Sequence, residues 1–175
     1  LEQAGCHVIY GLVGLKVHSK ITLIAREEEH GIRRYVHLGT GNYNDQTARI
    51  YSDFSLFTCS ESIGEDATEF FNMLSGYSAP LSWRRLIVAP FWLRREVTRL
   101  IEQEIRHANE GKPARIVIKV NSLVDPEIIS LLYRASNAGV DISLIVRGIC
   151  CLRAGVPGLS ERITVRSLIG RFLEH

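Results

Sequence analysis

The chain has 175 residues, which is enough for one ordinary domain or two small ones. Its hydrophobic content of 46% can fill real cores, and its formal net charge of +2 argues against a strongly basic nucleic-acid-binding module. The four cysteines include no CxxC pair, which is typical of reduced thiols in a cytoplasmic protein. No apolar run reaches transmembrane length, and no signal peptide is visible. Because the sequence starts at Leu1, in what resembles the end of a helix closed by Gly5, we expect a fragment of a longer protein.

The first half of the chain is predicted to form a sheet and one helix. Alternating apolar and polar residues predict strands over 6–10, 16–25, 33–38 and 50–58. A helix is predicted over 61–74. A break rich in Gly, Ser and Pro follows over 75–83, so we place a domain boundary between residues 82 and 83.

The second half alternates strands with helices. Strands are predicted over 86–89, 115–120, 141–146 and 163–167. One helix is predicted over 92–109 and closed by Gly111, and another runs from the cap Asp125 and Pro126 to Gly139. This order predicts βαβ units with right-handed crossovers. Both halves are therefore α/β, and the first favours antiparallel strands.

A histidine between two lysines is the leading candidate for chemistry. On a strand over 16–25, Lys16, His18 and Lys20 share one face. An imidazole nitrogen can attack phosphorus while ammonium groups neutralise phosphate oxygens. The same pattern also fits the solvated side of an edge strand, so this stretch alone leaves both interpretations open.

Three further features could bind an anion or a nucleotide. Gly39-Thr40-Gly41-Asn42 follows the second hairpin strand, and glycines there let backbone N–H groups approach an anion. Arg147 directly follows a strand, where open α/β sheets collect ligand groups, and it could hold a phosphate or be an ordinary surface residue. Tyr51 could stack on a base, bond a phosphate, or simply pack.

Six stretches spread over the whole chain together resemble the long-form polyphosphate kinase family. They are Gly14 to Lys20, His37 to Asn44, Thr47 to Asp53, Val120 to Asp125, Leu144 to Cys150 and Gly170 to His175. The resemblance implies an α/β fold of two phospholipase-D-like subdomains, with mixed sheets flanked by helices, both truncated. Residues 1–82 would be the end of the first subdomain, and 83–175 the start of the second.

The resemblance also implies a reaction and the residues that perform it. Such enzymes transfer the terminal phosphoryl group of ATP reversibly to polyphosphate through a phosphohistidine. His18 is similar in position to the phosphorylated histidine, and His175 to its general-acid partner, while His37 would support the site. The residues implied to bind ATP or polyphosphate are Tyr51, Arg147, His175, Lys20 and Asn42.

The sequence departs from the wider superfamily in ways that affect these expectations. Ala25 stands where the general motif has an aspartate, a loss that polyphosphate kinases tolerate. The family's Mg²⁺ ligands lie upstream of Leu1, so we expect no metal ligands within this chain and no activity from it alone. Leu173-Glu174-His175 is also what a histidine-tag linker would leave behind.

The implied partners are ATP, ADP and polyphosphate, with no nucleic acid. We expect a cytoplasmic, homo-oligomeric parent that can associate peripherally with membranes. Two other functions use the same residues: a phospholipase-D-like phosphodiesterase or nuclease, and a non-catalytic polyanion-binding module relying on Lys16, Lys20 and Arg147. The first predicts diester cleavage without ATP, and the second predicts salt-sensitive binding without covalent chemistry.

Overall fold

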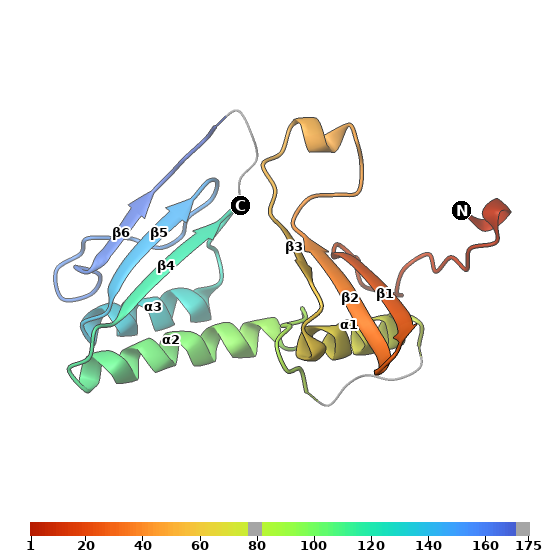
Figure 1. Cartoon of the computed structure of the whole chain (residues 1–175). Helices are drawn as coiled ribbons and strands as arrows, with labels where there is room; N and C mark the ends of the chain where they lie inside the picture. The colour runs from red at the N-terminus through yellow and green to blue at the C-terminus, as the bar shows by residue number, and fades with distance from the viewer. Residues whose placement is uncertain (77–81, 171–175) are drawn as a thin grey trace. The chain divides into compact units, whose positions relative to one another are not determined.

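The computed structural model describes residues 1–76 and 82–170 (Figure 1). The chain divides into two compact units, Leu1–Leu86 and Ile87–His175. Each unit is α/β, with a three-stranded sheet and helices in its described residues, as predicted. The domain boundary between residues 82 and 83 stays a prediction. Within 1–76 and 82–170, no helix combines the length and apolar character needed to cross a membrane.

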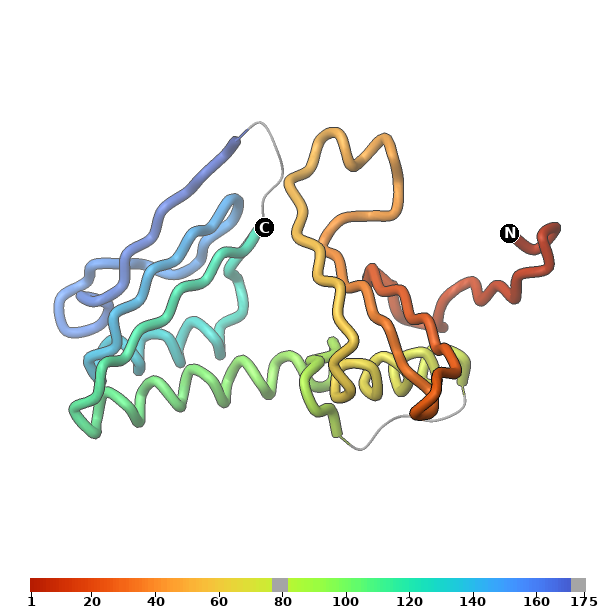
Figure 2. The backbone as a smooth tube through the Cα atoms, in the orientation of Figure 1, coloured from red at the N-terminus to blue at the C-terminus, as the bar shows by residue number. Residues whose placement is uncertain are grey.

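The first unit contains an antiparallel sheet in the order β1-β2-β3. Its strands are β1 (Lys20–Glu28), β2 (Gly31–Gly39) and β3 (Ser55–Thr58). The register pairs Lys20 with Gly39, and Gly39 with Ser55. The start of β1, the end of β2 and the start of β3 therefore lie side by side at one end of the sheet. We call this end the sheet edge. Figure 2 shows the loop between β2 and β3 extending beyond this edge.

Helix α1 (Glu61–Leu74) covers one face of this sheet. Val36, Ala67 and Phe70 are buried between them. Helix and strand approach closely at Gly64, where an added Cβ would lie 2.8 Å from the Cβ of Arg34. Because side chains alternate along a strand, Val36 faces α1 while His37, and Thr22 opposite it on β1, lie on the other face.

The second unit contains a parallel sheet in the order β4-β5-β6, formed by β4 (Arg115–Val120), β5 (Asp141–Val146) and β6 (Ile163–Arg166). Helices α2 (Leu93–Asn109) and α3 (Pro126–Asn137) pack against each other and against the sheet (Figure 1). The core is built from both helices and the sheet, with Leu132 and Leu144 at 0% and 1% exposure. The predicted strand–helix–strand order is confirmed for β4, α3 and β5.

The structure contradicts two predicted strands. Residues 6–10 have no strand structure, and the positive φ angles of Gly11 and Gly14 turn the chain just after them. Residues 86–89 are not a strand either. The Leu86 N–H, which a strand would offer to a neighbour, instead donates to the carboxylate of Asp66.

Two other predicted strands begin later than expected, and the first of them extends to Glu28 instead of ending at residue 25. The strand predicted over 16–25 begins only at Lys20, because its partner β2 ends at Gly39 and leaves residues 16–19 unpaired. The strand predicted over 50–58 is reduced to Ser55–Thr58, and a 3₁₀ helix, Thr47–Arg49, precedes it. His18 and Tyr51 are therefore in loops that adjoin the sheet edge.

Candidate functional site

His18 and Lys20 are in contact at the open end of the β1–β2 hairpin. The Lys20 ammonium donates to the His18 carbonyl oxygen at 2.7 Å, and its Nζ lies 3.1 Å from both Nδ1 and Nε2 of the ring. The lone pairs of the two ring nitrogens diverge, so one ammonium cannot align with both. The pairing therefore places a cation beside the ring while the exposed His18 keeps a nitrogen accessible to a reactant.

Burial and two charged neighbours change the pKa of Lys20. Partial burial lowers the pKa of Lys20, and the positive charge of Lys16 lowers it further. The carboxylate of Asp53 acts in the opposite direction. An arriving phosphate would relieve the repulsion between the two lysines, so this edge of the sheet is suited electrostatically to an anion.

The glycine turn is organised around Asp53. The Thr40 hydroxyl donates to Oδ1 of Asp53 at 3.4 Å and accepts from the Phe54 N–H at 2.9 Å, while the Thr40 N–H donates to the Phe54 carbonyl at 3.0 Å. A Cβ at Gly41 would overlap the Asp53 carboxylate. Both donors of Thr40, its N–H and its hydroxyl, are thus engaged within the turn, whereas the sequence suggests that the donors of this turn are available to an anion.

Asp53, which lies against the glycine turn, is a candidate that the sequence pattern did not indicate. It lies within the family-like stretch Thr47 to Asp53, but only Tyr51 was selected from that stretch. The signal that could have identified it is a carboxylate one loop away from a Gly-x-Gly turn, since a side chain pressed against the turn requires a glycine there.

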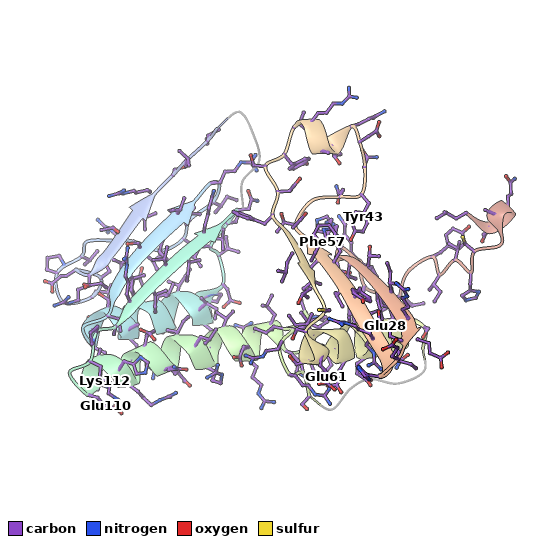
Figure 3. The ribbon with its side chains drawn as sticks, in the orientation of Figure 1. Glu28, Tyr43, Phe57, Glu61, Glu110 and Lys112 are labelled. Atoms are coloured by element: carbon purple, nitrogen blue, oxygen red, sulfur yellow. The ribbon has the colours of Figure 1, made fainter. Side chains whose placement is uncertain are left out.

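His37 ties the glycine turn to the sheet through Tyr43. Its Nδ1 lies 2.7 Å from the Tyr43 hydroxyl, which also accepts a hydrogen bond from Thr22 at 3.0 Å. The His37 ring packs on Phe57 at a centroid distance of 4.4 Å. Figure 3 shows Tyr43 and Phe57 together at this end of the sheet, with Glu28 at the other end. These contacts hold Tyr43 against the sheet, and a role of His37 in a reaction stays a prediction.

Asn42 and Tyr51 lie on the same loop, between β2 and β3. Asn42 is exposed, and its carbonyl accepts from the Asn44 N–H at 2.8 Å. Tyr51 is half-buried and lies just after the 3₁₀ helix. Within the described residues, neither side chain forms a hydrogen bond with His18 or Lys20. Their roles in binding ATP or polyphosphate therefore stay predictions.

Arg147 belongs to the second unit, directly after β5. Its backbone N–H donates to Val120 at 3.1 Å, and its Nη1 donates to Oδ1 of Asn121 at 3.4 Å. Gly148 is tightly held, since an added Cβ would lie 3.0 Å from the Asn121 carbonyl oxygen. The half-buried guanidinium thus lies at the carboxyl edge of the parallel sheet, with further N–H groups able to bind phosphate bidentately.

Two expectations concern residues or groups that the structure leaves undefined. His175, the expected general acid, lies outside the described residues. Within the described part of the chain, no group of three or more His, Cys, Asp or Glu side chains could hold a metal ion. The four cysteines are free thiols, and Cys6, Cys59 and Cys151 are exposed.

Comparison with known proteins finds matches over the whole chain. Residues 1–80 match the model for polyphosphate kinase C-terminal domain 1, and residues 86–175 match that for C-terminal domain 2. Polyphosphate kinases of Thermosynechococcus vestitus and Synechocystis are 55% and 56% identical over all 175 residues.

A crystal structure of polyphosphate kinase from Porphyromonas gingivalis superposes with a TM-score of 0.89 at 42% identity, covering 99% of this chain and 29% of that one. The chain spans about a quarter (24%) of the length of the curated relatives it matches. It aligns with both C-terminal domain models in their natural order, and the motifs found in the sequence lie within them. The chain belongs to the polyphosphate kinase family.

Proposed function

We propose that this chain is part of a longer protein that reversibly transfers the terminal phosphoryl group of ATP to polyphosphate, with His18 as the phosphorylated residue. The observation that carries the proposal is the contact between the Lys20 ammonium and the exposed His18 ring. Family membership supports the same assignment. Because the chain has only a quarter of the relatives' length, we expect it to be inactive alone.

The reaction proceeds in two displacements. A ring nitrogen of His18 attacks the γ-phosphorus of ATP, and the bond from that phosphorus to the β–γ bridging oxygen breaks, so that ADP leaves with the electron pair. A terminal phosphate oxygen of polyphosphate then attacks the phosphohistidine and breaks its N–P bond. Each displacement leaves His18 ready for the next, and the reverse sequence makes ATP.

The other proposed site residues act by charge and position. Lys20 neutralises oxygens of the transferring group beside His18, and Asp53 holds the glycine turn that carries Asn42. Arg147 binds a phosphate of ATP, as does Tyr51. His175 would protonate the leaving oxygen.

Mg²⁺ would neutralise phosphate charge in the full-length enzyme. We place its ligands in other parts of the parent, as the family resemblance implies. The proposed substrates are ATP, ADP and polyphosphate. The parent is proposed to be a cytoplasmic homo-oligomer that can associate peripherally with membranes.

The test uses the full-length parent with γ-labelled ATP and Mg²⁺. We expect acid-labile label on the peptide that contains His18, loss of the label in His18→Ala, and its retention in the control His30→Ala, which changes an exposed histidine in the β1–β2 turn. Label that survives His18→Ala would overturn the assignment. Cleavage of phosphodiesters without ATP, or salt-sensitive polyanion binding without label, would indicate one of the two other functions.

A further inference from the structure

A buried carboxylate in the first unit has no place in the chemistry proposed above. Asp66 lies in the second turn of α1 and is 1% exposed. Its Oδ1 accepts from the Arg84 N–H at 3.0 Å. Its Oδ2 accepts from the N–H groups of Arg84, Arg85 and Leu86 at 3.1, 2.6 and 2.8 Å. Three consecutive backbone donors therefore converge on one carboxylate.

Breaking these hydrogen bonds would cost more free energy than breaking an ordinary surface contact. A carboxylate taken out of water must be compensated by hydrogen bonds, and here backbone N–H groups of one short segment supply them. The donors also lose their own partner if the carboxylate is removed. The segment 84–86 is therefore held to α1 by bonds that form together.

The segment that Asp66 binds lies at the end of the first unit. Residues 84–86 are the last residues of the first unit, and the chain passes from them into the second unit. Helix α1 in turn packs on the sheet that carries Lys20, through Ala67 and Phe70. Asp66 thus connects the exit of the chain from the first unit to the element that supports the phosphoryl site.

We propose that Asp66 is a positioning residue for phosphoryl transfer from ATP, acting by fixing the point where the chain leaves the first unit. This inference rests on the proposed function, in which His18 and Arg147 come from different units. Transfer rates depend steeply on the placement of reacting groups, and a misplacement of about 1 Å can cost about 100-fold. The role predicts a defect in reactions that need both units and none in reactions that need the first unit alone.

Two phosphoryl donors distinguish reactions that need both units from reactions that need only the first unit, and both donors can be tested in the full-length parent. ATP requires Arg147 of the second unit, whereas phosphoramidate, a small reagent that phosphorylates histidine directly, requires only an intact His18. In Asp66→Asn we expect the rate of His18 labelling from ATP to fall at least tenfold and the rate from phosphoramidate to stay within about twofold. Hydrogen exchange should show faster exchange of the amides of 84–86 only.

Matched variants control for side effects. Glu65→Gln removes the exposed ion pair from Glu65 to Arg84 but leaves the Asp66 carboxylate in place, so it should behave as the unmodified enzyme. Should Asp66→Asn fail to fold, Arg85→Pro deletes one donor without altering α1, and Arg85→Ala keeps that N–H and serves as its control.

Three results would overturn the positioning role of Asp66. Equal loss of labelling from both donors would show that Asp66 only maintains the fold of the first unit and would overturn the inference. Undiminished labelling from ATP, or unchanged exchange of the amides of 84–86 in Asp66→Asn, would overturn it as well. Failure of ATP to label His18 in the unmodified parent would instead overturn the proposed function.

Discussion

The Tyr43 hydroxyl lies 2.7 Å from Nδ1 of His37 and accepts a hydrogen bond from Thr22 at 3.0 Å. The loop after β2 is thereby connected to two strands of the sheet through one phenol.

Tyr43→Phe should release this connection without removing the aromatic ring. With the hydroxyl gone, the turn that carries Asn42 loses its tether to His37 and Thr22, so we expect kcat/KM for ATP in the full-length parent to fall between about 10- and 100-fold. Steady-state kinetics measure the effect. Tyr10→Phe, at a tyrosine that is 85% exposed, is the control. Equal activity of both variants would show that the loop needs no such tether.

Lys16→Gln should shift the alkaline limb of the pH–rate profile to higher pH. Burial and then the charge of Lys16 lower the pKa of Lys20, so removing that charge raises the pKa and keeps the ammonium protonated further into the alkaline range. The shift should shrink at high salt. The profile of kcat/KM against pH provides the measurement.

The control for this shift is Lys112→Gln, in the second unit, where Lys112 pairs with Glu110 (Figure 3). It removes the same charge without affecting Lys20, so its alkaline limb should not move. An alkaline limb that stays in place or moves to lower pH in Lys16→Gln would contradict the assignment of Lys20 as the titrating cation.

Gly41→Ala should act through Asp53. An added Cβ overlaps the Asp53 carboxylate, which must then move away from the Thr40 hydroxyl. We expect kcat/KM to fall by about tenfold or more in Gly41→Ala and in Asp53→Ala, and the double variant to be no worse than Asp53→Ala alone. A double-mutant cycle measures this. Losses that multiply would mean that the two positions act independently.

Local signals in the sequence were sufficient for the regular elements of the second unit. The bounds of β4 and β5 agree with prediction, because apolar residues recur at every second position in both strands, as in Ile142, Leu144 and Val146 of β5. Helix α3 starts where Asp125 and Pro126 predict it. The bounds predicted for α1, 61–74, also agree with the structure.

Contacts between distant residues could not be predicted in this way. Leu86 looked like a strand residue, but its N–H is used by Asp66, 20 residues earlier in the chain. Asp53 and Tyr43 acquire their roles only when the loop after β2 folds back on the sheet. The first residues of the strand predicted over 16–25 form a loop, yet His18 still contacts Lys20, because only Ser19 lies between them.

Asp125→Ala should destabilise the second unit in a pH-dependent way. Oδ1 of Asp125 accepts from the N–H groups of Glu127 and Ile128 at 3.0 and 3.1 Å, and Arg94 donates to it at 2.8 Å. The bond from the Ile128 N–H, with the charge of Arg94, holds the pKa of Asp125 below its usual value of 3.8. The folded form therefore favours the carboxylate.

A folded-state pKa below the unfolded value means that the stabilisation is complete above the unfolded pKa and disappears as pH falls through the folded one. The midpoint of thermal unfolding of the full-length protein should thus be lower in Asp125→Ala by a constant amount above about pH 5, and the difference should shrink below about pH 4. Asp125→Asn keeps an acceptor for the cap but carries no charge, so its difference should be smaller at neutral pH. A difference that is constant down to pH 3, or that grows in acid, would contradict a role for the ionised cap.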